Sequence, residues 1–163
     1  MFRAAIITLS DKGSKGERED ESGMIIREMI MSIGASVSHY EVLPDEKPGI
    51  VEVLSRLSDS GTIDLILTTG GTGVSPRDVT PEATREVIER ELPGMAEAMR
   101  AESLKKTPHA MISRAITGIR KRTLIVNLPG SPRAVRENLA VILPALPHAI
   151  EKINGDLREC GSA

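Results

Sequence analysis

The chain has 163 residues, of which 40% are hydrophobic and 27% charged, and its formal net charge is -2. This length suits a single domain spanning residues 1–163, and the balance excludes an unfolded acidic chain and a general nucleic-acid binder. With one Phe, one Tyr and no Trp, neither base stacking nor an aromatic membrane belt is available. The single cysteine, Cys160, rules out an intrachain disulfide. No apolar stretch has signal-peptide or membrane length, so we expect a cytoplasmic protein.

Apolar spacing predicts alternating strands and helices in the first half of the chain. Residues 3–9 form an isoleucine-rich run typical of a strand, and residues 22–33 repeat apolar side chains at helical spacing. Residues 37–43 predict a second strand nearer the sheet edge, followed by a helix that Gly61 closes. Residues 64–69 carry apolar side chains without alternation, which indicates a strand buried on both faces.

Two further helices are expected in the middle of the chain. Thr80 followed by Pro81 predicts a helix start with a hydroxyl N-cap, and that helix should reach about residue 92. Residues 95–104 predict a short helix after the break at Pro93. Residues 107–118 do not match any of these patterns.

The last part of the chain repeats the order of strand, loop and helix. Residues 123–127 predict a buried strand, and Ser131 followed by Pro132 is again typical of a helix start. The final helix should reach residue 150 with kinks at Pro144 and Pro147. Strands that alternate with helices imply an α/β fold of three layers, with a mostly parallel central sheet and helices on both faces.

Unusual residues follow each of the four predicted strands. In open α/β sheets, ligands bind beyond the carboxyl ends of the strands. The loops at this edge are therefore the candidate site. They comprise residues 10–12, 44–46, 69–78 and 127–131.

The loop after the third strand carries Gly70, Gly71 and Gly73 together with two threonines, Thr69 and Thr72. Glycines let the backbone turn sharply and point several N–H groups at one anion, while hydroxyls add donors. This pattern predicts phosphate binding. The alternative is a tight strand-to-helix turn, which needs only one or two glycines.

Two common nucleotide motifs are excluded at this loop. Gly71-x-Gly73 lacks the third glycine of a dinucleotide fingerprint, because Pro76 stands at that position, and no Gly-Lys-Ser/Thr follows to make a P-loop. The three histidines show no ligand spacing, which argues against a histidine-held metal and a Ser-His-Asp triad.

Asp45 and Asp78 follow different strands, so the fold can bring them together. Paired carboxylates beside a phosphate loop suggest Mg²⁺, which prefers oxygen ligands and bridging phosphates. Each aspartate could instead cap a turn, and Asp20 could equally cap a helix. Arg77 and Arg114, together with Lys12, could neutralise phosphate oxygens, with surface solvation as the alternative for each.

Several motifs, in order along nearly the whole chain, resemble the molybdopterin adenylyltransferases, a family that includes the bacterial Mog protein, the G domain of gephyrin and the plant Cnx G domain. Lys12 is a departure, because many members carry arginine there, and lysine keeps the charge without the bidentate geometry. The motifs that carry the resemblance are residues 69–73, 77–84, 93–100, 113–114 and 127–132.

The resemblance implies transfer of AMP from Mg-ATP to the terminal phosphate of molybdopterin, with release of pyrophosphate. Asp45 and Asp78 match the two family aspartates associated with catalysis, and we expect them to hold Mg²⁺. The nucleotide and molybdopterin would contact the remaining matched residues. These are Ser10, Asp11, Asp20, Ser22, Gly23, Thr69, Gly70, Gly71, Thr72, Gly73, Arg77, Ser113, Arg114, Asn127, Pro129, Gly130 and Ser131.

The resemblance also implies a homotrimer and passage of the product to a molybdenum insertase. A non-catalytic molybdopterin-binding or carrier protein of the same fold is the alternative function. The pair Asp45 and Asp78 favours the enzyme, because a carrier has less need of a metal-binding pair.

Overall fold

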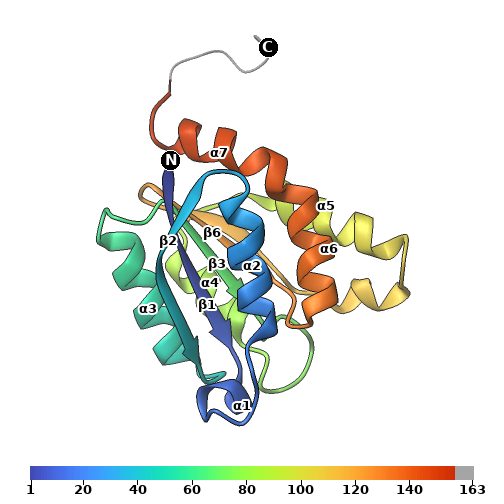
Figure 1. The fold of residues 1–163 in the computed structure, drawn as a ribbon. Coiled ribbons are helices and arrows are strands. Elements are labelled where there is room, and N and C mark those ends of the chain that lie inside the picture. The colour runs from blue at the N-terminus through green and yellow to red at the C-terminus, as the bar shows by residue number, and fades with distance from the viewer. Residues whose placement is uncertain (157–163) are drawn as a thin grey trace.

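The computed structural model describes residues 1–156 (Figure 1). Cys160 lies outside them. Six strands form one sheet in the order β2-β1-β3-β6-β5-β4. The first four of that order run parallel, while β5 and β4 are antiparallel to their neighbours. The strands are β1 (Phe2–Leu9), β2 (Ala35–Leu43), β3 (Leu65–Thr69), β4 (Arg90–Glu91), β5 (Thr117–Arg120) and β6 (Thr123–Leu128).

Helices cover both faces of this sheet (Figure 1), as the sequence predicts. Helices α2, α5, α6 and α7 pack on one face, and α3 and α4 on the other. No helix within residues 1–156 is long and apolar enough to cross a membrane. The helices are α1 (Asp11–Ser14), α2 (Glu21–Met31), α3 (Lys47–Asp59), α4 (Thr80–Val87), α5 (Pro93–Leu104), η1 (Pro108–Ile112), α6 (Pro132–Ile142), η2 (Leu143–Ala145) and α7 (Leu146–Ile153).

The core is aliphatic and lies in two layers on either side of the sheet. Neighbouring strand residues face opposite layers: Ile6 lies in the cluster that contains Ile26 of α2, and Ile7 in the cluster that contains Leu54 of α3. All four of these side chains are fully buried. A strand with apolar side chains on both faces cannot alternate in polarity, which is why the central strands form unbroken apolar runs in the sequence.

The helix predicted to start at Thr80 and Pro81 is present, but its predicted hydroxyl N-cap and its predicted end are wrong. Its N-cap position is Val79 without a side-chain cap, because the Thr80 hydroxyl donates instead to the Gly70 carbonyl at 2.9 Å. The helix ends at Val87 rather than near residue 92. The Glu89 amide beyond it pairs with a carbonyl of β5, and β4 follows. Tertiary pairing therefore overrides the local helical pattern here.

The end of the chain follows the prediction more closely. The Ser131 hydroxyl caps α6 by accepting from the Ala134 amide at 3.3 Å. The expected kink near Pro144 is confirmed as the 3-10 turn η2 between α6 and α7. Residues 107–118, which match no pattern in the sequence, contribute η1 and the start of β5. The following turn has Lys121 at a positive φ of 51°.

Strand register brings the carboxyl ends of the parallel strands to one edge. Thr69 of β3 lies opposite Thr8 of β1 on one side and Leu128 of β6 on the other. The arrows of β1 and β2 point toward the end of the molecule where α1 lies (Figure 1). The loops that follow β1, β2, β3 and β6 therefore meet at this edge.

Candidate functional site

The glycine loop begins directly after β3 with two glycines in the left-handed region. Gly70 has φ 97° and Gly71 has φ 65°, values that disfavour any side chain. A Cβ on Gly70 would also collide with the Leu9 carbonyl, and one on Gly71 with the Thr80 hydroxyl. Both glycines are therefore required by backbone conformation and by close packing.

Three successive amides of this loop have no acceptor within residues 1–156. The Gly70 amide pairs with the Leu128 carbonyl at 3.2 Å, but those of Gly71, Thr72 and Gly73 donate to no acceptor within residues 1–156. Neighbouring backbone N–H groups of this kind form anion-binding concavities. Anion binding by this loop stays a prediction.

Arg114 stabilises the glycine loop through hydrogen bonds to backbone carbonyls. Its guanidinium donates to the Gly73 carbonyl at 2.6 Å and to the Asp78 carbonyl at 2.7 Å, and its amide donates to the Thr72 carbonyl at 2.8 Å. It also pairs with Glu82, and this hydrogen bond lowers the pKa of the Glu82 carboxyl. Arg114 lines neither of the two cavities at the loop, so the geometry gives it a supporting position.

Two cavities flank the loop. Cavity 1, of about 590 Å³, lies between the loops after β1, β2 and β3, and cavity 2, of about 430 Å³, lies toward α5, η1 and α6. They share a wall made by Gly71, Asp78, Gly130 and Ser131. The expected site residues that line only cavity 1 are Ser10, Asp20, Ser22, Asp45, Thr69 and Gly70, and those that line only cavity 2 are Thr72, Gly73, Ser113 and Pro129.

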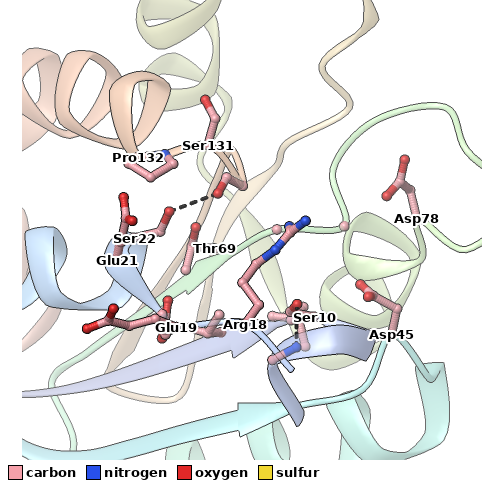
Figure 2. A pocket seen from close by; sticks show the side chains of 17 residues that line it. Ser10, Arg18, Glu19, Glu21, Ser22, Asp45, Thr69, Asp78, Ser131 and Pro132 are labelled. Atoms are coloured by element: carbon pink, nitrogen blue, oxygen red, sulfur yellow. Dashed lines mark hydrogen bonds between the residues drawn. The ribbon is translucent and has the colours of Figure 1, made fainter. Parts of the chain in front are cut away.

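Asp45 and Asp78 both line cavity 1, where Figure 2 shows them on the same side. Burial raises the pKa of the Asp45 carboxyl, and the negative charges of Asp11 and Asp78 raise it further. The hydrogen bond from the Asp11 amide lowers this pKa, but the net direction is upward. Asp78 is held by the Ser75 amide, which donates to its Oδ2 at 2.9 Å. The two carboxylates therefore concentrate negative charge at one side of the cavity.

Asp11 and Arg77 bind each other rather than facing a cavity. The Arg77 Nε and Nη2 atoms donate to the two oxygens of Asp11 at 3.0 and 2.7 Å. These bonds are the main reason that the pKa of the Asp11 carboxyl is lowered. The Asp11 carboxylate also accepts from the Asp45 amide at 3.0 Å. Both side chains thus support the loop that carries Asp45.

Asp20 and Ser22 join α2 to the site. Asp20 Oδ1 caps α2 by accepting from the Gly23 amide at 2.9 Å, which confirms the helix-cap alternative. Its Oδ2 accepts from the Thr8 hydroxyl at 2.5 Å and from Tyr40. The Ser22 hydroxyl donates to the Gly130 carbonyl at 2.8 Å, which Figure 2 shows as a dashed line. Gly23 is buried beneath these groups and lines neither cavity.

Asn127 lies beneath the site and is fully buried. Its Nδ2 donates to the hydroxyls of Thr68 and Thr84 at 3.0 and 2.9 Å, and its Oδ1 accepts from the Ile116 amide at 3.2 Å. Because every polar atom of the side chain is used within the protein, the geometry gives Asn127 a structural role. Its side chain does not reach either cavity.

Several residues that line the two cavities are not among the site residues predicted from the sequence. Arg18 lines cavity 1, and Arg100, His109 and Asn138 line cavity 2. Arg100 lies on α5, His109 on η1 and Asn138 on α6, and Arg18 lies in the loop between α1 and α2, so all four lie outside the strand-end loops on which the sequence-based set is centred. Only Arg100 falls within a motif that carries the resemblance.

Known proteins resemble this chain over nearly its whole length. Residues 5–148 match the family described as "Probable molybdopterin binding domain". A molybdopterin adenylyltransferase of Helicobacter pylori is 43% identical over 153 residues, which cover 93% of this chain and 87% of the relative.

Solved structures agree with this assignment. The molybdopterin biosynthesis enzyme MoaB of Thermus thermophilus is 53% identical, with a TM-score of 0.90 and coverage of 96% of this chain and 98% of that one. The molybdopterin biosynthesis Mog protein of Mycobacterium ulcerans is 40% identical, with a TM-score of 0.87 and coverage of 94% and 99%. The chain belongs to the molybdopterin-binding domain family of molybdenum cofactor biosynthesis.

Proposed function

We propose that this protein is a molybdopterin adenylyltransferase, which transfers AMP from Mg-ATP to the terminal phosphate of molybdopterin and releases pyrophosphate. The wall shared by the two cavities is the observation that carries the proposal. A reaction between two bound substrates needs two adjacent binding spaces, and Gly71, Asp78, Gly130 and Ser131 line both. The adenylyltransferase relative from Helicobacter pylori supports the same assignment.

Asp45 and Asp78 fit a Mg²⁺ ion that is shared with phosphates. Both carboxylates line cavity 1, and their mutual repulsion contributes to the raised pKa of Asp45. Residues 1–156 hold no group of three or more side chains suited to a metal. Protein sites for Mg²⁺ usually supply one or two carboxylates and leave other positions to water and substrate phosphates. The bound ion would neutralise phosphate charge and orient the nucleotide.

The loop amides supply the electrostatic part of catalysis. An oxygen of the molybdopterin phosphate attacks the α-phosphorus of ATP, and the bond from that phosphorus to the bridging oxygen of the β-phosphate breaks. The electron pair leaves with pyrophosphate. The unpaired amides of Gly71, Thr72 and Gly73 are donors for the charge that develops on the phosphoryl oxygens. The attacking phosphate is ionised at neutral pH, so no strong general base is needed.

Incubation of the purified protein with molybdopterin and Mg-ATP tests this function. We expect adenylylated molybdopterin and pyrophosphate in equal amounts. The Asp78→Asn protein should lose most of the turnover and keep molybdopterin binding, because it retains the cavity and loses one carboxylate. Tight molybdopterin binding by the unaltered protein without any product would instead identify a carrier. The expected homotrimer and the transfer of product to a molybdenum insertase belong to the same proposal.

A further inference from the structure

Five carboxylates line cavity 1, although the proposed nucleotide is itself an anion. Arg18 is the single lysine or arginine among its lining residues within the described chain. Even with Mg²⁺ bound, the carboxylates that do not contact the ion would repel the phosphate groups. The lining carboxylates are those of Glu19, Asp20, Glu21, Asp45 and Asp78.

Arg18 has no partner among the residues that the structure describes. Its guanidinium makes no hydrogen bond or ion pair with any residue from 1 to 156, although five carboxylates line the same cavity. Figure 2 shows its side chain extending into the space between Asp45 and Asp78 on one side and Ser22, Thr69 and Ser131 on the other. The five N–H donors of the guanidinium therefore remain available within the cavity.

The segment that carries Arg18 is anchored at both ends. Before it, the Gly16 amide donates to the Gly13 carbonyl at 3.0 Å, and the Glu17 amide donates to the Lys12 carbonyl at 2.9 Å. After it, Asp20 caps α2 and accepts from the Thr8 hydroxyl of β1. These bonds fix the backbone on each side of Arg18. The arginine is thus presented to the cavity by an ordered loop.

We propose that Arg18 binds the phosphate groups of the nucleotide in cavity 1, an inference that rests on the proposed function. A guanidinium can donate two parallel hydrogen bonds to phosphate oxygens. In Figure 2 the Arg18 side chain lies between the Asp45 and Asp78 side of the cavity and the side of Ser22, Thr69 and Ser131, so a phosphate chain bound next to Asp45 and Asp78 would also contact the guanidinium. Arg18 thereby offsets the acidic lining and selects a phosphorylated ligand over an uncharged nucleoside.

Calorimetric binding of Mg-ATP and of adenosine, measured without molybdopterin, tests this role. We expect Arg18→Gln to weaken Mg-ATP binding by about tenfold or more, the size of a lost charge-assisted hydrogen bond, and to leave adenosine binding unchanged. The Mg-ATP affinity of Arg18→Lys should lie between those of the unaltered protein and Arg18→Gln, because lysine keeps the charge and loses the paired donors. Lys15→Gln is the matched control, because Lys15 lies on the same loop outside the cavity lining and should bind Mg-ATP normally.

The possible outcomes separate this inference from the proposed function. Arg18-dependent binding of Mg-ATP by a protein that makes no adenylylated product would support the inference and overturn the function. Equal Mg-ATP affinity of Arg18→Gln and the unaltered protein would overturn the inference, even in an active enzyme. Failure of the unaltered protein to bind Mg-ATP would also overturn the inference. An equal loss of Mg-ATP affinity in Lys15→Gln would overturn it too, because that result would indicate a general effect of charge.

Discussion

Asp11 and Asp45 are joined by two reciprocal hydrogen bonds. The Asp11 amide donates to the Asp45 carboxylate at 3.1 Å, and the Asp45 amide donates to the Asp11 carboxylate at 3.0 Å. Arg77, next to Asp78 in sequence, donates two further hydrogen bonds to the Asp11 carboxylate. The loops after β1, β2 and β3 are therefore linked through one carboxylate. Asp11 and Arg77 are positioning residues for the Asp45 and Asp78 pair.

The first prediction concerns this link. Asp11→Ala removes the acceptor for Arg77 and for the Asp45 amide, so the Asp45 carboxylate should lose its fixed place. We expect the turnover number to fall by roughly tenfold to a hundredfold, since small misplacements cost this much, and the Mg²⁺ concentration for half-maximal activity to rise. Steady-state assays over a Mg²⁺ series measure both quantities.

Two companion variants distinguish positioning from a general loss of structure. Asp11→Asn keeps one carbonyl acceptor and should recover part of the turnover. Lys12→Ala alters the adjacent exposed residue, whose side chain has no hydrogen bond or ion pair within the described chain, and should leave the Mg²⁺ response unchanged. An unaltered Mg²⁺ response in Asp11→Ala would contradict the positioning role.

Replacing Asp45 should affect stability with a definite sign. The raised pKa of Asp45 means that its ionised form at neutral pH opposes folding, so Asp45→Asn should raise the melting temperature by about 1 to 3 °C. The gain should disappear below the ordinary aspartate pKa of about 3.9, because Asp45 is then neutral in both folded and unfolded protein. Thermal unfolding by circular dichroism from acid to neutral pH measures the difference.

Asp45→Asn should also lose most of the turnover. Glu46→Gln, an exposed neighbour that lines neither cavity, is the control and should change neither property. A melting temperature of Asp45→Asn below that of the unaltered protein at neutral pH would show that the carboxylate stabilises the fold, opposite to the direction predicted.

Replacing Asn127 distinguishes a structural role of this residue from a contact with the ligand. Asn127→Ala leaves the Thr68 and Thr84 hydroxyls and the Ile116 amide without their partner, so we expect a loss of about 2 to 4 kcal/mol in the free energy of unfolding. Urea unfolding measures this, with the more exposed Asn154→Ala as the comparison. Near-normal stability combined with lost molybdopterin binding would show that Asn127 contacts the ligand.

Gly73 offers a way to move Asp78 without unfolding the protein. A Cβ at Gly73 would lie 2.8 Å from the Asp78 Oδ2 atom, and Gly73 does not have a positive φ. Gly73→Ala should therefore displace the carboxylate, lower turnover by about tenfold or more and leave the melting temperature nearly unchanged. Gly49→Ala is the matched control, because a Cβ there meets no atom within 4 Å. Full activity in Gly73→Ala would show that the position of the Asp78 carboxylate is not critical.

The sheet and its ligand-binding edge could be predicted because their signals are local or topological. The unbroken apolar run of β3 indicates a strand buried on both faces, and parallel strands end at one edge. These two facts place the loops that carry Asp45 and Asp78 at the same edge of the sheet. The Ser131 cap is equally local, because its hydroxyl contacts an amide three residues along the chain.

The remaining features depend on contacts between distant segments. The sequence suggests Arg77 as a phosphate ligand, but in the structure it binds Asp11, which is 66 residues away along the chain. Arg114 holds a loop 41 residues earlier through the Gly73 carbonyl. Arg18 belongs to a loop whose approach to cavity 1 follows from the packing of α2 on the sheet. Sequence spacing carries no signal for such contacts.

Two of the four residues in the wall between the two cavities, Gly71 and Gly130, are glycines. A Cβ on Gly130 would lie 3.3 Å from the Gly70 Cα atom, so the two loops touch through glycines. In the proposed reaction, two substrates on either side of such a wall can meet directly and need no covalent carrier on the enzyme. Initial rates should therefore follow a sequential, ternary-complex law, with intersecting double-reciprocal lines rather than the parallel lines of a ping-pong mechanism.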